Sequence, residues 1–334
     1  MTSARCSRRS FTSCSRRACG TRQIDPHVAA SLQPQSTGQY RKGLLVFLAF
    51  LSFYALHPRT VEEFDDLLVE WKNDNICAAP PSQTLFRNAI AGLEKAFPRF
   101  KDQLILSKQI ANAWKVCVRP SHTVPISRPW VMLLGCHLSQ RGMGRLGACL
   151  ILQYLQCCRP SEILGLRGGS ILTALEYLEH GFGADDGIPR GVLFLGQKAG
   201  TKSGRPQASI VSNHIALRLL QHFRATTAFG SMLSSHSSLS SYNKYIGVAA
   251  KHFGLDQVGW TAHSPRAGYA SDAAILGLDF TTVREHGRWV SDKSLRGYMD
   301  VMSVMGGELA LQLRPYIHLV GDIEANFDKY FKWW

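Results

Sequence analysis

The chain contains 334 residues, of which 45% are hydrophobic and 19% charged, and it carries a formal net charge of +14. This composition is that of a globular protein with enough apolar material for a core, and the length predicts two domains or three. A basic excess of this size favours a polyanionic partner, nucleic acid before an anionic membrane surface. Six arginines precede the first acidic residue, Asp25, but without them the remainder still carries +8, so the preference for nucleic acid does not depend on this tail.

Residues 1–38 are rich in Ser, Arg and Cys and show little periodicity, so we expect a disordered basic tail. Three further interpretations stay open: an organellar transit peptide, a basic arm on DNA and a faulty gene prediction. The nine cysteines of the whole chain include no Cys-x-x-Cys pair, which disfavours a zinc site and indicates reduced thiols in an intracellular protein.

Residues 39–120 have a helical pattern and are predicted to form a small all-helical domain. The basic residues in its second half either contact DNA or form a solvated helical surface. The apolar run at 43–56 is shorter than the about 20 residues that span a bilayer, so it predicts a buried core helix. Thr60 and Glu63 form a capping box at the start of a second helix. Two further helices are expected, over 85–97 and 104–118.

Prolines mark residues 121–128 as the linker to a second domain, which extends over 129–334. This domain is predicted to begin with two apolar helices, which end near Cys158. Short strands follow at 191–196 and 207–211, and the Gly- and Lys-rich stretch between them predicts a β-hairpin. Further helices are expected over 213–223, 242–253, 265–276, 281–285 and 308–320.

Three segments of the second domain carry candidate chemistry. In the first, proline is favoured at the first helical position, so a helix is expected to start at Pro160 and to place Arg159 at its N-terminus, where an anion is attracted. Glu162 lies on the same face. In the second, His263 and Arg266 are three residues apart and can approach one site at the entry of a helix. Alone, each pair is as typical of a protein surface as of an active site.

The third segment runs from Gly287-Arg-Trp289 to Tyr298. Together, in this order, the segments resemble the catalytic boxes of the tyrosine recombinase (phage integrase) family. Tyr298 follows Trp289 at the family's usual offset, and tryptophan in place of the commoner histidine is similar to a eukaryotic-type variant, in which the indole N–H can still donate a hydrogen bond. The other matching motifs are Arg159-Pro-Ser-Glu162, the hairpin segment Thr201-Lys-Ser-Gly204 and His263-Ser-Pro-Arg266.

The resemblance implies a role for each matched residue. Arg159 and Arg266 would clamp a phosphate, and Glu162 would orient Arg159. Lys202 would act as the general acid and His263 would assist proton transfer. The two aromatic residues complete the set: Trp289 would order the phosphate and its surroundings, and Tyr298 would form a 3′-phosphotyrosine.

These residue types also suit the reaction on physical grounds. Attack on a phosphodiester adds charge to its non-bridging oxygens, and arginines, which are always charged and bidentate, stabilise it. A tyrosine hydroxyl has an ordinary pKa of about 10 and needs a base or a positive field before it attacks. A lysine can protonate the 5′-hydroxyl that leaves. Because the tyrosyl bond conserves the energy of the phosphodiester, we expect no metal, no ATP and no other cofactor.

The resemblance further implies a mainly α fold with a small β-hairpin or sheet. A helical, SAM-like core-binding domain would precede the α+β catalytic domain. The expected activity is site-specific recombination or integration of double-stranded DNA by a homotetramer, for example in a mobile element, without a membrane. The expected location is the nucleus in a eukaryote and the cytoplasm otherwise, and targeting to an organelle stays open.

Two other functions remain compatible with the sequence. A domesticated or decayed recombinase would bind DNA without cutting it, although every catalytic position is filled here. A type IB topoisomerase would use the same tyrosine chemistry without choosing a site. A protein of the membrane surface is disfavoured because the basic charge follows no amphipathic helix.

Overall fold

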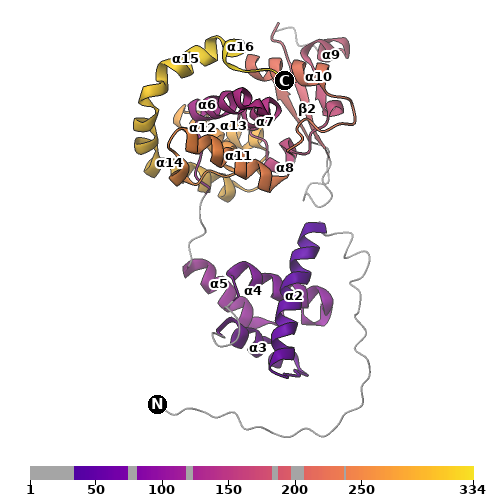
Figure 1. The fold of residues 1–334 in the computed structure, drawn as a ribbon. Coiled ribbons are helices and arrows are strands. Elements are labelled where there is room, and N and C mark those ends of the chain that lie inside the picture. Colours follow the sequence, from indigo (N-terminus) through magenta and orange to yellow (C-terminus); the bar gives the residue numbers. More distant parts are fainter. Residues whose placement is uncertain (1–33, 74–80, 118–122, 183–186, 197–206, 237) are drawn as a thin grey trace. The chain divides into compact units, whose positions relative to one another are not determined.

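The computed structural model describes residues 34–73, 81–117, 123–182, 187–196, 207–236 and 238–334, except for some side chains near 34 and between 300 and 310. The chain divides into two units, Met1–Arg119 and Pro120–Trp334, which are drawn in Figure 1. The boundary lies beside the predicted linker. In the described residues the elements are helices and one three-stranded antiparallel sheet, which confirms the predicted mainly α fold class. No helix within the described ranges is long and apolar enough to cross a membrane.

The first unit is helical. Its first described helix begins at Pro34, so the prediction of a disordered tail up to residue 38 is wrong for residues 34–38, and the rest of that tail lies outside the described residues. Proline suits this place because its missing N–H has no partner to lose in the first turn. The helices are α2 (Pro34–Phe53), α3 (Val61–Asn73), α4 (Gln83–Ala96) and α5 (Ile105–Cys117), with a 3₁₀ turn, η1 (Pro98–Phe100).

Helices α2 and α4 approach each other at two glycines. A Cβ on Gly43 would lie 2.6 Å from the backbone nitrogen of Ala89, and one on Gly92 would lie 2.7 Å from the carbonyl oxygen of Tyr40. Larger residues there would force the helices apart. The core behind this contact combines the buried faces of α2, α3 and α4 with η1 and the residue before α5. It contains Phe47, Phe50, Leu51, Leu68, Trp71, Phe86, Leu93, Phe100 and Leu104.

A buried carboxylate joins α3 to α5. Asp65 interrupts the apolar face of α3, and its two oxygens accept the backbone N–H groups of Leu106 at 2.7 Å and Ser107 at 2.8 Å. The first N–H groups of a helix have no partner within the helix, so this side chain caps α5 from another element. One of the two hydrogen bonds of the predicted capping box at Thr60 is present, since the Thr60 hydroxyl accepts the backbone N–H of Glu63 at 3.2 Å.

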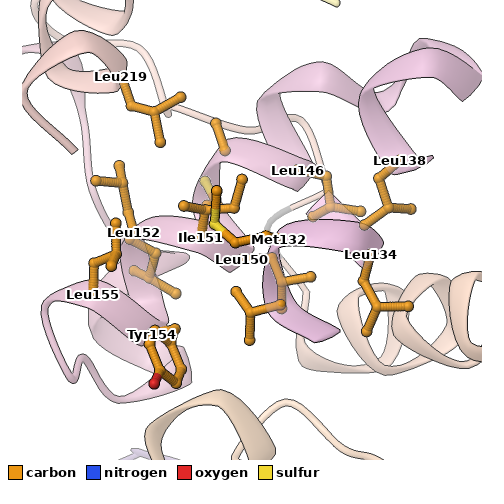
Figure 2. Packing of buried hydrophobic residues seen from close by; sticks show 14 of the residues in the cluster. Met132, Leu134, Leu138, Leu146, Leu150, Ile151, Leu152, Tyr154, Leu155 and Leu219 are labelled. Carbon is orange, nitrogen blue, oxygen red and sulfur yellow. The ribbon is translucent and has the colours of Figure 1, made fainter. Parts of the chain in front are cut away.

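The second unit is built around two apolar helices, α6 (Arg128–Leu138) and α7 (Gly144–Leu155), joined by a π turn, η2 (Ser139–Met143). Figure 2 shows the buried side chains of both helices, with Leu219 of a third helix, α10 (His214–Thr226), on the side of α7. Nearly all residues of α7 are buried, so this helix is the centre of the domain core.

The sheet lies beside these helices. Strands β2 (Gly191–Gly196) and β3 (Gln207–Val211) pair antiparallel, with Val192 opposite Ile210, at the positions predicted for the hairpin. A third strand, β1 (Ile171–Leu172), pairs with β2 and was not predicted, because two residues carry no readable alternation. The turn of the hairpin, residues 197–206, lies outside the described residues.

Further short elements and helices complete the second unit. The helix expected over 308–320 is divided in the structure, since its first part belongs to a helix that runs through Gly306-Gly307 and ends at Leu313. Glycine in a helix costs about 1 kcal/mol but does not end it. The elements are α8 (Pro160–Ile163), η3 (Gly168–Ser170), α9 (Ala174–Glu179), α11 (Leu239–His252), η4 (Asp256–Val258), α12 (Ser264–Ile275), α13 (Phe280–Gly287), α14 (Asp292–Leu313), η5 (Arg314–Tyr316), α15 (Ile317–Ala325) and α16 (Phe327–Tyr330).

The C-terminal segment packs on its own unit. Val320, Ile323, Phe327 and Phe331 are buried in the same core as α6 and α7.

Candidate active site

Arg159 lies at the start of α8, as its sequence predicts. Its backbone is extended and Pro160 takes the first helical position. The carboxylate of Glu162 accepts the backbone N–H of Arg159 at 2.7 Å and its Nη1 at 2.5 Å. The side chain of Glu162 is only 7% exposed, whereas that of Arg159 is 36% exposed. Glu162 therefore holds Arg159 from the buried side, and the rest of the guanidinium group of Arg159 stays open to solvent.

Arg266 lies in the first turn of α12 and is 3% exposed. Its Nη1 donates to the carbonyl of Cys157 and its Nη2 to the carbonyl of Gly287. The guanidinium carbon lies 4.1 Å from the ring centroid of Trp289, close enough for a cation–π contact. Burial lowers the pKa of Arg266, but an arginine stays protonated at any physiological pH. The guanidinium charge of Arg266 is thus buried, and its two hydrogen bonds fix the orientation of the group.

Trp289 follows the end of α13. A Cβ on Gly287 would lie 1.6 Å from the Trp289 ring, so the ring folds back over a position where only glycine fits. Residue Arg288 between them adopts a left-handed backbone with φ of 56°, which ends the helix and turns the chain. The Gly-Arg-Trp motif therefore has a geometric role at this turn.

Tyr298 lies on α14, half-buried, and Leu295 on the same helix is fully buried beside it. The ring centroids of Tyr298 and Trp289 are 6.0 Å apart, and the rings are tilted by 57°. The hydroxyl of Ser271 on α12 lies 3.2 Å from the backbone carbonyl oxygen of Tyr298 and 2.9 Å from that of Ala267, and its one hydrogen can be donated to either. Helices α12 and α14 thereby hold the tyrosine next to the tryptophan.

A cleft of about 710 Å³ brings these side chains together. Five of the residues predicted from the sequence line it, and they come from α8, α12, α14 and the residues that precede α12 and follow α13. The predicted general acid, Lys202, and its neighbour Lys198 lie outside the described residues. The five are Arg159, His263, Arg266, Trp289 and Tyr298.

The charges around the cleft are predominantly positive. Burial acts to raise the pKa of Glu162, but the charge of Arg288 and the hydrogen bonds from Arg159 outweigh it, so the pKa is lowered and the group is a carboxylate at neutral pH. Its single negative charge contacts Arg159 at 2.5 Å and Arg288 at 3.0 Å, while Arg266 lies nearby. Three guanidinium groups with one carboxylate leave a positive field that suits an anionic ligand.

His263 is exposed on the cleft side of the turn before α12. Desolvation lowers its pKa, and the charges of Arg266 and Arg159 lower it further. The imidazole is therefore neutral at pH 7 and has a nitrogen that can accept a proton.

Sequence reasoning missed two contributors to this site. Arg288 donates to Glu162, and the carbonyl of Cys157 accepts hydrogen bonds from Arg266 and Arg288. Arg288 stands inside the recognised Gly-Arg-Trp motif, so its place in the sequence was a usable signal. Cys157 offered none, because it acts through its backbone. Lys293, at the start of α14, also lines the cleft.

Comparisons with known proteins find a likeness in structure but none in sequence. No known family profile matches the chain, and no curated protein matches it by sequence. Among solved structures, the crystal structure of XerA recombinase aligns with 83% of this chain and 94% of that chain, with 15% sequence identity and a TM-score of 0.41. This TM-score is too low to support an activity, so an activity has to be inferred from the side chains of the cleft.

Proposed function

We propose that this protein is a tyrosine recombinase that cuts and rejoins double-stranded DNA through a 3′-phosphotyrosyl intermediate on Tyr298. The observation that carries the proposal is the cleft itself. Side chains from segments more than a hundred residues apart in the sequence line it, and they are the types that phosphoryl transfer to tyrosine needs.

In the proposed reaction the phosphate binds between Arg159 and Arg266, whose guanidinium groups stabilise the charge that develops on the non-bridging oxygens. The Tyr298 oxygen attacks phosphorus, its proton leaves to the neutral His263 or to water, and the 5′-oxygen departs. Lys202 protonates this oxygen. Attack by the freed 5′-hydroxyl of a partner strand reverses these steps and restores the tyrosine.

Double-stranded DNA is the proposed substrate, since the chain is strongly basic and the cleft has an excess of positive groups. The helical first unit would serve as a core-binding domain and the second as the catalytic domain. Exchange between two duplexes requires four cleavages, so we propose a tetramer on DNA. Site-specific recombination or integration is favoured over non-specific relaxation by the His263-Ser-Pro-Arg266 box.

The test uses Tyr298→Phe, which removes only the attacking oxygen and leaves the ring packed against Trp289. The substrate is the DNA that flanks the gene, nicked near the cleavage site so that the covalent intermediate accumulates. The wild type should give a protein–DNA adduct that survives denaturant and forms in the presence of EDTA. Tyr298→Phe should give no adduct and should still shift the DNA on a gel.

The matched control is Tyr177→Phe, the same chemical change on α9, where the ring contacts Phe182 and does not line the cleft. It should form the adduct at the wild-type rate. A wild type that binds the DNA but never forms an adduct would favour the decayed recombinase. An adduct on Tyr298→Phe would show that another residue is the nucleophile, and relaxation of any plasmid without a preferred site would favour a topoisomerase.

A further inference from the structure

Two consecutive backbone carbonyls at the end of α13 hold the two arginines that line the cleft. The carbonyl of Gly287 accepts from Nη2 of Arg266, and the carbonyl of Arg288 accepts from Nη2 of Arg159 at 3.2 Å. The aim of both guanidinium groups therefore depends on the path of the chain at residues 287 and 288. This path is set by the left-handed backbone of Arg288.

The side chain of Arg288 fastens this turn to the rest of the site. It is 13% exposed, and its Nη2 donates to Glu162 at 3.0 Å and to the carbonyl of Cys157 at 3.4 Å. Its Nη1 donates to the carbonyl of His286 at 3.1 Å. The same guanidinium thus contacts the carboxylate that orients Arg159 and the carbonyl that orients Arg266.

A left-handed backbone is unfavourable for a residue with a Cβ, and glycine would adopt it without strain. Strain of this kind is tolerated where surrounding contacts impose it, and it occurs often at functional sites. Cys157, whose carbonyl Arg266 and Arg288 share, is also left-handed, with φ of 46°. Two strained turns therefore meet at the arginines of one cleft.

The charge of Arg288 also matters. Glu162 is buried and has one carboxylate oxygen toward Arg159 and the other toward Arg288. Without Arg288, this second oxygen would keep only the backbone N–H of Arg159 at 2.7 Å, so the carboxylate could turn and neutralise Arg159 more completely. A shared carboxylate leaves more of the Arg159 charge for a ligand in the cleft.

We propose that Arg288 is a positioning residue, which fixes Glu162 and the carbonyls at the end of α13 so that Arg159 and Arg266 converge on one phosphate. This inference rests on the proposed function for the identity of the phosphate as a DNA phosphodiester. The convergence itself predicts that the cleft binds a free oxyanion, whether or not the protein cuts DNA.

The test compares Arg288→Gly, which keeps the left-handed backbone and removes the side chain, with Arg288→Lys, which keeps a charge without the fork. Groups that orient a ligand-binding side chain typically change activity by about 10- to 100-fold when they are removed. We expect Arg288→Gly to slow single-turnover adduct formation by about this factor and to weaken the binding of inorganic phosphate, with DNA affinity nearly unchanged. Its Tm should fall because a buried ion pair is broken, so the rates are compared at a temperature at which both proteins are folded. Arg288→Lys should recover part of the rate.

Two readouts distinguish positioning from a structural role. Glu162→Gln combined with Arg288→Gly should be slowed by less than the product of the two single effects, because the two residues share one contact that acts on Arg159. On a methylphosphonate linkage, which lacks one charged oxygen, the effect of Arg288→Gly should shrink. The matched control is Arg284→Ala, which removes an exposed ion pair between α13 and Asp292 and should leave the rate unchanged.

The outcomes separate this inference from the proposed function. A wild type without adduct contradicts the proposed function, and the phosphate titration then still decides the role of Arg288. Equal phosphate affinity of the wild type and Arg288→Gly, or no phosphate binding by the wild type, overturns the inference. So does an effect that multiplies with that of Glu162→Gln. If Arg288→Gly does not fold, the same measurements on Arg288→Lys decide.

Discussion

Two cavities of the second unit are each lined by arginine, and they differ in the groups that surround it. In the first, Arg159 and Arg266 share a cleft with His263 and Tyr298. In the second, of about 490 Å³, Arg145 is surrounded by hydroxyl and small side chains. Both have an aromatic partner: Arg266 lies 4.1 Å from the ring centroid of Trp289, and Arg145 lies 5.1 Å from that of Trp334.

The difference lies in what surrounds each arginine, since both donate to backbone carbonyls. Arg266 donates to the carbonyls of Cys157 and Gly287 but has Arg159 beside it in the cleft. Arg145 donates to the hydroxyl of Thr227 at 2.7 Å and to the carbonyls of Leu233 at 3.1 Å and Thr226 at 2.9 Å, so the chain itself uses its donors. A single arginine bound in this way joins loops. Two arginines that line one cleft beside a tyrosine suit an anionic ligand. An arginine next to an aromatic ring is therefore no evidence of a binding site by itself.

The largest expected effect concerns salt. If the protein makes about six to ten phosphate contacts, its affinity for DNA should fall by about 10³–10⁵ between about 50 and 200 mM salt, because counterions are released from the DNA. Arg159→Ala should reduce the slope of log affinity against log salt by about one, and Arg145→Ala should leave it unchanged. Fluorescence anisotropy at several salt concentrations measures both. A flat wild-type response would point to a partner other than nucleic acid.

The next effect tests which residue completes the first cleft. Lys202→Ala should slow cleavage of an ordinary phosphodiester by about 10²–10⁴, the usual contribution of a general acid. A 5′-thio leaving group needs little protonation and should restore the rate. Lys198→Ala and Lys293→Ala are measured beside it, since Lys198 is the other lysine of the hairpin and Lys293 lines the cleft. If one of these shows the loss and the rescue, Lys202 is not the acid.

The same substitution in the two cavities should separate activity from stability. Arg266→Lys keeps a charge but loses the two-sided hydrogen bonding, and the rate of adduct formation should fall by about 10²–10³. Arg145→Lys should leave the rate nearly unchanged and lower the free energy of unfolding by about 1.5–3 kcal/mol, the contribution of charge-assisted hydrogen bonds. Single-turnover kinetics and urea unfolding give the two quantities. A large loss of rate in Arg145→Lys would erase the distinction between the cavities.

The smallest effect is a difference in response to acid. The pKa of His263 is lowered mainly by desolvation and further by the charges of Arg266 and Arg159. The pKa of His222 is also lowered mainly by desolvation; a backbone hydrogen bond at Trp334 opposes this, and the charge of Arg145 adds to it. The folded pKa of each imidazole therefore lies below the ordinary value of about 6.5, so both imidazoles are neutral at pH 7. As the pH falls through that pKa, His263 loses its ability to accept a proton and the rate of adduct formation should fall.

For His222 the same titration affects stability. A folded pKa below the unfolded value means that stabilisation is complete above about pH 6.5 and is lost as the pH falls through the folded pKa. The ring centroid of His222 lies 4.5 Å from those of Trp333 and Trp334. Protonation of His222 should therefore loosen the C-terminal segment first. His222→Gln should remove this part of the pH dependence of Tm and leave that of the rate intact. His263→Gln should remove the acid limb of the rate profile.

Local features were predictable from residues close in sequence. The helix start at Pro160 follows from the geometry of proline, and the hairpin strands follow from apolar segments on both sides of a Gly- and Lys-rich turn. The matched motifs identified five of the residues that line the cleft. The predicted helix boundaries differ from the observed ones by only a few residues where the apolar period is regular, as in α4 and α5.

Contacts between distant segments were decided by the tertiary structure alone. Asp65 caps α5 from 41 residues away, and Arg288 reaches Glu162 across 126 residues. Periodicity and capping patterns describe interactions within a few residues, where the backbone itself fixes the distance between side chains. Which carboxylate meets which arginine depends instead on how the helices pack. The sequence by itself therefore determined the helices and the candidate side chains, while packing decided that Arg288 contacts Glu162 and that Arg159 and Arg266 line one cleft.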